Sequence, residues 1–149
     1  MLLKDLGFNA IPEKYRTEIK PGDFEVGRVI AEHKERYTVT TEKGEFEAEI
    51  TGNLRYSASS REDFPAVGDW VELTIYDPDF SIIHRILPRY SIISRQATGK
   101  TSEIQIIATN MDYAFIAQAA DRDFNLNRLE RYLTICYTDR KSTRLNSSH

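Results

Sequence analysis

The sequence predicts a mainly β protein: a five-stranded barrel of the OB type, followed by the first strand and helix of a truncated α/β domain. Three observations support this fold class. Residues 24–87 alternate apolar and polar side chains with the period of two that is typical of strands. Glycine, proline and other turn-forming residues interrupt this stretch at short intervals. From residue 103 onward, an apolar run is followed by an apolar stripe with helical spacing.

The barrel domain is predicted at residues 24–88, with strands at 24–33, 36–42, 45–50, 67–76 and 80–87. Lys34-Glu35 and Lys43-Gly44 are the expected hairpin turns. The second is expected to be tight, because glycine accepts a positive φ. In the third strand Phe46, Ala48 and Ile50 alternate with glutamates, so we expect these three side chains to point inward. A longer connection before the fourth strand suits an OB barrel, although the pattern alone does not separate it from an SH3-like barrel.

The segments around the barrel have different compositions. Residues 1–23 are expected to form a polar, partly helical lead-in, and residues 89–102 a basic linker. Residues 103–138 are expected to begin the truncated domain, with a helix that Asn125 can cap through its side-chain oxygen. Residues 139–149 have no apolar period and resemble translated sequencing-adapter read-through. We therefore set them aside as a non-native tail and expect the chain to be a fragment.

The charge balance restricts how the chain could bind RNA. The chain has 20 Lys and Arg against 23 Asp and Glu, a net charge of −3. Bulk binding of a polyanion requires clustered cations, so RNA contact is expected only at local loops. The candidates combine cations for phosphates with an aromatic ring for base stacking. They lie on the first barrel loop and the long connection: Lys34, Arg36, Tyr37, Arg55 and Arg61.

Motifs for other chemistry are incomplete. Gly99-Lys100-Thr101 ends like a phosphate loop, but the first glycine is missing and an apolar strand follows. Residues 109–112 resemble a guanine-reading box without its lysine. The histidines have no metal-ligand spacing, and Cys136 is expected to be a buried structural thiol. We therefore assign no catalytic, cofactor-binding or metal-binding residue, and we expect a cytoplasmic monomer without a membrane span.

Several segments together resemble the small ribosomal subunit biogenesis GTPases, the RsgA (YjeQ or YloQ) family. They are Gly27-Arg28-Val29, GNLRY at 52–56, DFPAVGDWV at 63–71, EIQIIATNMD at 103–112 and FNLNRLERYL at 124–133. Their order and spacing make the resemblance specific, although no single motif does. Thr109 stands where this family usually has alanine.

The resemblance implies an OB barrel, a circularly permuted GTPase domain and a zinc-bearing C-terminal segment. The parent protein would hydrolyse GTP to GDP and phosphate during late maturation of the small ribosomal subunit. This part would dock on rRNA, would bind neither GTP nor zinc, and would be inactive because the guanine box and phosphate loop are missing. The alternative is a stand-alone OB or SH3-like barrel that acts as a protein-interaction module. The acidic balance and the outward Glu45, Glu47 and Glu49 favour that alternative.

Overall fold

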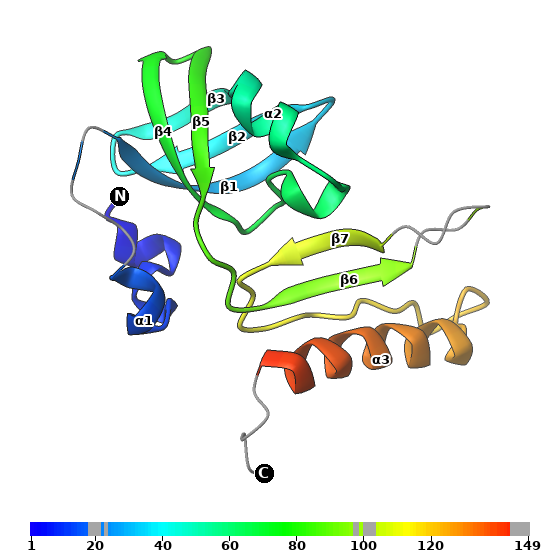
Figure 1. Cartoon of the computed structure of the whole chain (residues 1–149). Helices are drawn as coiled ribbons and strands as arrows, with labels where there is room; N and C mark the ends of the chain where they lie inside the picture. Colours follow the sequence, from blue (N-terminus) through cyan, green and yellow to red (C-terminus); the bar gives the residue numbers. More distant parts are fainter. Residues whose placement is uncertain (18–21, 23, 97–98, 100–103, 144–149) are drawn as a thin grey trace.

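A closed five-stranded barrel is the centre of the computed structural model, which describes residues 1–17, 22, 24–96, 99 and 104–143. Around the barrel the strand order is β1-β2-β3-β5-β4, and β4 pairs back with β1 (Figure 1). The β3–β5 pair is parallel and the other pairs are antiparallel. This arrangement is that of an OB barrel and confirms the predicted fold class. The strands are β1 (Glu25–His33), β2 (Arg36–Thr41), β3 (Gly44–Ile50), β4 (Trp70–Asp77) and β5 (Phe80–Ile86).

The turns explain where the strands begin and end. Lys34 and Glu35 both adopt a left-handed backbone, with φ of 49° and 65°, as a two-residue hairpin turn between β1 and β2 requires. The long connection is not one loop, because it contains the short helix α2 (Gly52–Ser57) and a 3-10 helix (Arg61–Asp63). β4 begins at Trp70, three residues later than predicted, because the preceding residues turn away to contact the segment after the barrel.

The barrel core is formed by inward side chains from all five strands. It comprises Val29, Tyr37, Val39, Ala48, Ile50, Val71, Leu73 and Ile83. The predicted alternation in β3 holds for Ala48 and Ile50, but Phe46 is only half-buried and lies outside this cluster. Phe46 is two residues from the start of β3, close to the β2–β3 turn. An inward position there does not give full burial.

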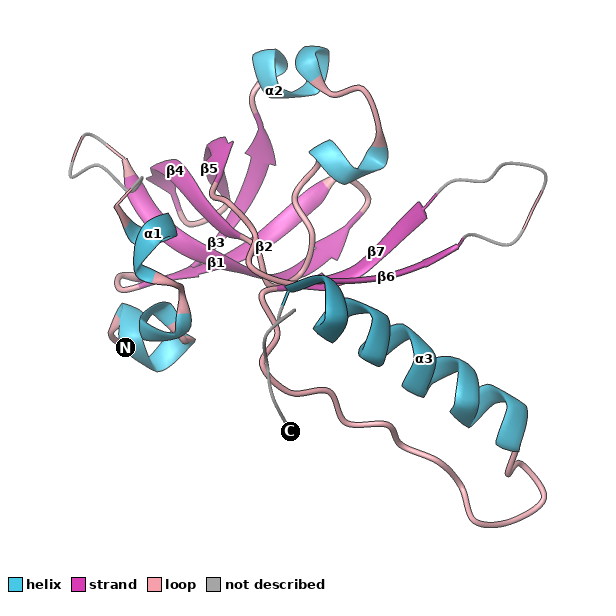
Figure 2. Cartoon of the chain, turned by 60° about the horizontal axis from the view of Figure 1, so that its bottom comes forward, coloured by secondary structure: helices cyan, strands magenta, loops and turns pink. Residues whose placement is uncertain are grey.

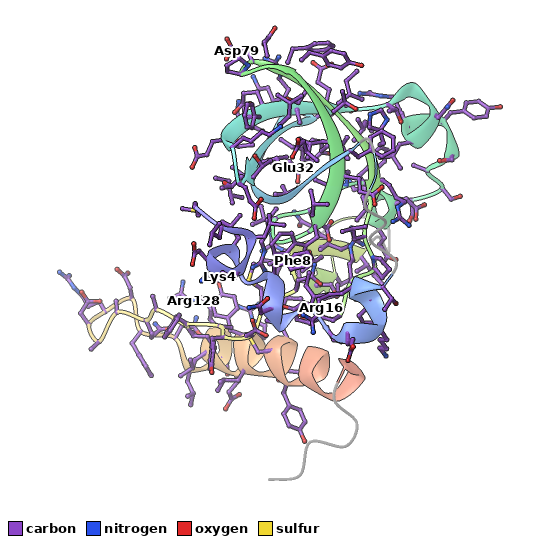
Figure 3. The ribbon with its side chains drawn as sticks, turned by 90° about the vertical axis from the view of Figure 1, so that its left-hand side faces the viewer. Lys4, Phe8, Arg16, Glu32, Asp79 and Arg128 are labelled. Carbon is purple, nitrogen blue, oxygen red and sulfur yellow. The ribbon has the colours of Figure 1, made fainter. Side chains whose placement is uncertain are left out.

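The lead-in packs on the outside of the barrel and forms a second apolar cluster. It contains two 3-10 helices (Leu3–Leu6 and Phe8–Ala10) and the short helix α1 (Glu13–Arg16). Phe8, labelled in Figure 3, meets Trp70 edge to face, with 5.3 Å between ring centroids. Ile11 is buried beside Trp70 and Leu87. Aromatic pairs of this geometry add to the free energy gained by burying the rings. Trp70 therefore holds the lead-in against the barrel.

A two-stranded antiparallel sheet follows the barrel and corrects the predicted linker. β6 (Ile92–Gln96) lies within that linker and pairs with β7 (Ile104–Thr109), as Figure 2 shows. The first strand of the predicted α/β segment is therefore paired with a strand from the predicted linker. The basic residues of this segment indicate a linker, but its apolar pair Ile92-Ile93 is the signal of a strand.

Helix α3 (Leu126–Thr143) packs along β6 and leaves much of its apolar stripe uncovered. Leu126 and Leu133 are 56% and 54% exposed, and Cys136 is only partly buried, contrary to the expected buried thiol. The helix extends through residues 139–143, which the sequence analysis had set aside. The apolar run 113–117 is not a strand, and Phe115 within it is 97% exposed.

A buried ion pair joins the barrel to the chain that follows it. Asp69 is 0% exposed and receives two hydrogen bonds from Arg89, both at 2.8 Å. The Thr109 hydroxyl donates to Asp69 at 2.6 Å, and the Ala66 backbone N–H donates at 2.7 Å. The same arginine donates to the carbonyl oxygens of residues 62 and 64. A buried carboxylate of this kind is tolerated because it is paired and fully hydrogen-bonded.

Gly68 brings β7 close to the barrel. Its φ of +98° is in the left-handed region, and a Cβ there would lie 1.9 Å from the Thr109 carbonyl oxygen. The Gly68 carbonyl accepts hydrogen bonds from Asn110 Nδ2 and Arg28 Nε, both at 3.1 Å. Arg28 also donates to the carbonyls of Leu6 and Asn110, at 2.6 Å each. One arginine thus connects the lead-in, the barrel and the end of β7.

Candidate nucleic-acid interface

The β1–β2 turn carries two of the predicted RNA-binding cations. Lys34 lies in the turn and is exposed. Arg36, at the start of β2, forms an ion pair with Glu49 of β3 at 3.5 Å, with the two side chains 55% and 48% exposed. Exposed pairs of this kind contribute little stability. Arg36 can therefore exchange its glutamate for a phosphate at small cost.

Helix α2 brings a third predicted cation to the same end of the barrel. The helix starts because the Thr51 side chain accepts a hydrogen bond from the Leu54 backbone N–H at 3.0 Å, and Leu54 packs against the barrel core. Arg55 then reaches Glu35 in the β1–β2 turn at 2.9 Å. The first barrel loop and the long connection, predicted separately, are therefore neighbours.

Tyr37 cannot serve as the predicted stacking platform. It is 2% exposed and belongs to the barrel core, so neither face of its ring is open to a base. Burial, followed by the charges of Glu32 and Glu35, raises the pKa of Tyr37 from 10.0 to about 12. The alternation that places Tyr37 on one face with Val39 already contained the signal for its burial.

The raised pKa of Tyr37 predicts a loss of stability at alkaline pH. An unfolded tyrosine ionises near pH 10, whereas folded Tyr37 stays neutral up to about pH 12. Its contribution is complete below pH 10 and disappears as the pH rises toward 12. Urea denaturation across this window should show a smaller decline for Tyr37→Phe than for the unmodified chain. Tyr56→Phe, at a position 94% exposed, should leave the decline unchanged. An equal decline in all three proteins would contradict the prediction.

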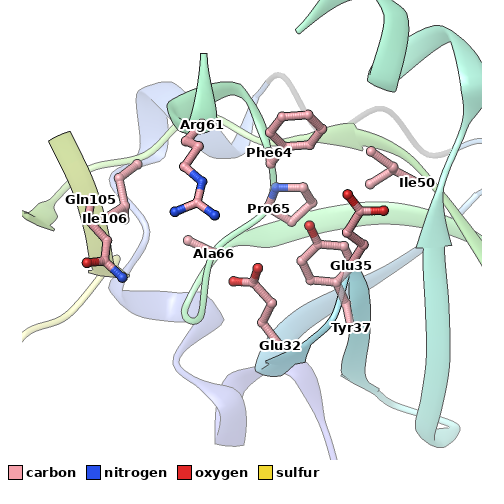
Figure 4. A pocket seen from close by; sticks show the side chains of 10 residues that line it. All are labelled: Glu32, Glu35, Tyr37, Ile50, Arg61, Phe64, Pro65, Ala66, Gln105 and Ile106. Carbon is pink, nitrogen blue, oxygen red and sulfur yellow. The ribbon is translucent and has the colours of Figure 1, made fainter. Parts of the chain in front are cut away.

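Arg61, the fifth predicted residue, lines a cavity of about 400 Å³ between the barrel and β7 (Figure 4). The cavity walls come from four separate parts of the chain: the β1–β2 hairpin from the end of β1 to the start of β2, the end of β3, the 3-10 helix with the residues after it, and β7. The lining residues are Glu32, Glu35, Tyr37, Ile50, Arg61, Phe64, Pro65, Ala66, Gln105 and Ile106. Apart from Tyr37 and Arg61, sequence analysis did not select these residues as site residues.

Acidic side chains mark the side of the barrel away from these loops. Glu45 of β3 is exposed there, and Glu47 accepts a hydrogen bond from the Thr38 hydroxyl at 2.8 Å. Glu49, at the other end of β3, pairs with Arg36 beside the loops. At the β4–β5 turn, Tyr76 and Phe80 stack with 5.4 Å between ring centroids, beside Asp77 and Asp79. This surface would repel phosphate, so the loops at the other end suit a polyanion better.

Neither a metal site nor a membrane-spanning helix is found among the described residues. These residues contain no group of three His, Cys, Asp or Glu side chains that could hold a metal ion, so no zinc site fits them. Within the same residues, no helix is both long enough and apolar enough to cross a membrane. Lys100 and Thr101 of the phosphate-loop-like segment lie outside the described residues.

The fold and this loop geometry define an OB-type barrel protein with a short sheet and a helix attached. Two solved structures share the fold. YjeQ from Thermotoga maritima has a TM-score of 0.54 at 18% identity, over 78% of this chain and 38% of that chain. YloQ, described as a circularly permuted GTPase, has a TM-score of 0.53 at 20% identity over the same shares. No protein-family model matches the chain.

Sequence relatives identify the family. A small ribosomal subunit biogenesis GTPase RsgA from Oceanobacillus iheyensis is 44% identical over 134 residues, 87% of this chain and 38% of the relative. One from Lactiplantibacillus plantarum is 46% identical over 112 residues, 75% of this chain and 32% of the relative. One from Opitutus terrae is 37% identical over 144 residues, 91% of this chain and 39% of the relative. The chain belongs to the RsgA family and corresponds to the N-terminal part of these relatives, spanning under two fifths of their length.

Proposed function

We propose that this chain is the RNA-docking part of a GTPase that acts in late maturation of the small ribosomal subunit in the cytoplasm. The barrel binds rRNA through the loop end formed by Lys34, Arg36, Arg55 and Arg61. The observation that carries the proposal is the 2.9 Å contact between Arg55 and Glu35, which joins the two predicted RNA-binding segments into one edge. The names of the relatives supply the partner, since each is a small ribosomal subunit biogenesis GTPase.

The GTPase activity and the zinc belong, in this proposal, to the part of the relatives that lies beyond the match. The parent protein hydrolyses GTP to GDP and phosphate and holds zinc there. The barrel positions that activity on the subunit as a monomer. Few phosphates are neutralised by four cations, two of which already pair with glutamates, so binding should depend only weakly on salt.

Subunit binding tests the docking role. Lys34→Ala combined with Arg55→Ala should weaken binding of the chain to purified small ribosomal subunits about tenfold or more at low salt, because two cations leave the edge. Lys43→Ala is the matched control: this lysine pairs with Glu25 and lies in the β2–β3 turn, at the other end of the β2 strand. Circular dichroism should show all variants folded. Unchanged affinity of the double variant would contradict the proposal.

That contrary outcome would favour the second candidate, a protein-interaction module. The exposed Tyr76–Phe80 stack with its flanking carboxylates is the specific observation in its favour. Aromatic faces and carboxylates together attract the cationic side chains of a basic polypeptide. In that case Phe80→Ala should weaken binding to the subunit, whereas replacing the cations at the loop end should not.

We expect the 149-residue chain to neither bind nor hydrolyse GTP. A phosphate cradle requires a complete glycine-rich loop before a helix, and Gly99-Lys100-Thr101 lacks that context in the sequence. Equilibrium dialysis with radiolabelled GTP, and a phosphate-release assay with and without small subunits, should give background values. Saturable binding that Lys100→Ala abolishes would overturn this expectation.

A further inference from the structure

We propose that the 400 Å³ cavity between the barrel and β7 binds an unpaired guanine base, presented by an RNA strand lying along the loop end. The proposal rests on the proposed RNA-docking function and adds to it a base-reading site. Of the five residues selected from sequence, only Arg61 would contact an edge of this base.

The walls of the cavity suit a flat heterocycle. Phe64, Pro65 and Ile106 supply apolar surface, and Ile50 closes one end (Figure 4). The volume lies in the range of small-molecule sites, which enclose most of the surface of their ligand. Bases of single-stranded RNA stack on such surfaces through their apolar faces. The cavity therefore has room for a purine without rearrangement of the barrel.

Two charged groups face this space from opposite sides. The Glu32 carboxylate, at the end of β1, and the Arg61 guanidinium, on the 3-10 helix, both point toward the region around Ala66 (Figure 4). Among the described residues, neither charged group has an ion pair or hydrogen bond, whereas Glu35 is already engaged by Arg55. An ionised carboxylate only accepts hydrogen bonds and a guanidinium only donates them. The ligand must therefore donate at one edge, accept at another, and carry no net charge.

Guanine meets all three conditions. Its N1–H and N2–H₂ groups donate side by side and match the two oxygens of Glu32, while O6 and N7 accept from Arg61. Adenine presents an acceptor at N1 beside its amino group, so one oxygen of Glu32 would face a lone pair. Inosine keeps N1–H, O6 and N7 but lacks the amino group.

The guanine could come from RNA or from a free nucleotide, and the charges favour RNA. Glu32 and Glu35 both line the cavity and would repel a triphosphate held close to the base. Lys34 lies between them in the chain, in the exposed turn at the rim. An RNA strand carries one phosphate per nucleotide. If its backbone passes the cations of the loop end while one base turns into the cavity, this repulsion is avoided.

Nuclear magnetic resonance titration of the 149-residue chain tests the proposal. Guanosine should shift the backbone amide signals of Ala66, Gln105 and Ile106, and adenosine should bind roughly tenfold more weakly. Inosine should fall between them. Glu32→Gln should weaken guanosine binding roughly tenfold, because an amide offers only one acceptor oxygen. Glu45→Gln, an equivalent change on the exposed face of β3, should have no effect. Circular dichroism spectra should be unchanged in both variants.

Further ligands identify the source of the base. A pentanucleotide with one guanosine between uridines should shift the same amides, whereas GTP at the same concentrations should leave them unmoved. Tighter binding of GTP than of this RNA would overturn assignment to an RNA base. Equal affinity for guanosine and adenosine, or shifts that bypass the cavity, would overturn the guanine site itself. If the chain binds small subunits but guanosine leaves these amides unmoved, the cavity proposal alone is wrong. If the chain binds guanosine but does not bind the small subunit, the proposed docking function is wrong.

Discussion

Replacing Asp69 with alanine should lower the free energy of unfolding by about 3–5 kcal/mol, the range seen when one partner of a buried ion pair is removed. Asp69 is fully buried and receives hydrogen bonds from Arg89, Thr109 and the Ala66 backbone. Its removal leaves the Arg89 guanidinium, 13% exposed, without a counter-charge. This loss is large compared with the total stability of about 5–15 kcal/mol that is usual for a small domain.

Urea denaturation followed by tryptophan fluorescence measures this effect, because the single tryptophan, Trp70, is next to Asp69 in the chain. Asp79→Ala is the matched control: Asp79 is exposed in the β4–β5 turn (Figure 3), so its replacement should change stability by less than about 0.5 kcal/mol. Arg89→Ala should be as damaging as Asp69→Ala, because it leaves the buried carboxylate unpaired. A loss below about 1 kcal/mol in Asp69→Ala would show that the ion pair does not hold the junction.

Gly68→Ala should detach β7 from the barrel at a cost of about 3 kcal/mol, combining left-handed backbone strain with overpacking. The new methyl group would lie 1.9 Å from the Thr109 carbonyl oxygen, and backbone atoms cannot move aside as a flexible side chain can. The hydrogen bonds from Thr109 N to Val67 O, at 2.8 Å, and from Asn110 Nδ2 to Gly68 O would be broken.

Gly44→Ala separates the two contributions. Gly44 also has a positive φ, +126°, but nothing lies within 4 Å of a Cβ there. It should therefore show backbone strain alone. Hydrogen exchange should reveal faster exchange at the amides of Thr109 and Asn110 in Gly68→Ala, with the barrel strands still protected. Equal destabilisation by the two substitutions, with unchanged exchange at Thr109, would contradict the close approach of β7.

Most of the barrel could be predicted from sequence, because strand alternation and turn residues are local signals. The predicted strands match β1, β2, β3 and β5 to within about a residue at each end, and the Lys34-Glu35 turn is in place. The candidate site was harder to predict. Lys34, Arg36 and Arg55 could be selected because exposed cations in loops need no knowledge of packing. Glu32 and Gln105 could not, because what gives them a role is a cavity between segments about 70 residues apart.

The sequence by itself determined a small five-stranded β-barrel, the family resemblance and the positions of the basic loops. Tertiary structure alone decided three further points. The parallel β3–β5 pair distinguishes an OB barrel from an SH3-like one, and no local pattern encodes which edges meet. Tyr37 is a core residue and not a stacking platform, since its exposure depends on what covers its face of β2. Asp69, Arg89 and Thr109 form a buried network because the chain leaving β5 and the end of β7 both return to the barrel. Polar groups 20 and 40 residues apart thereby come within hydrogen-bonding distance in a buried space.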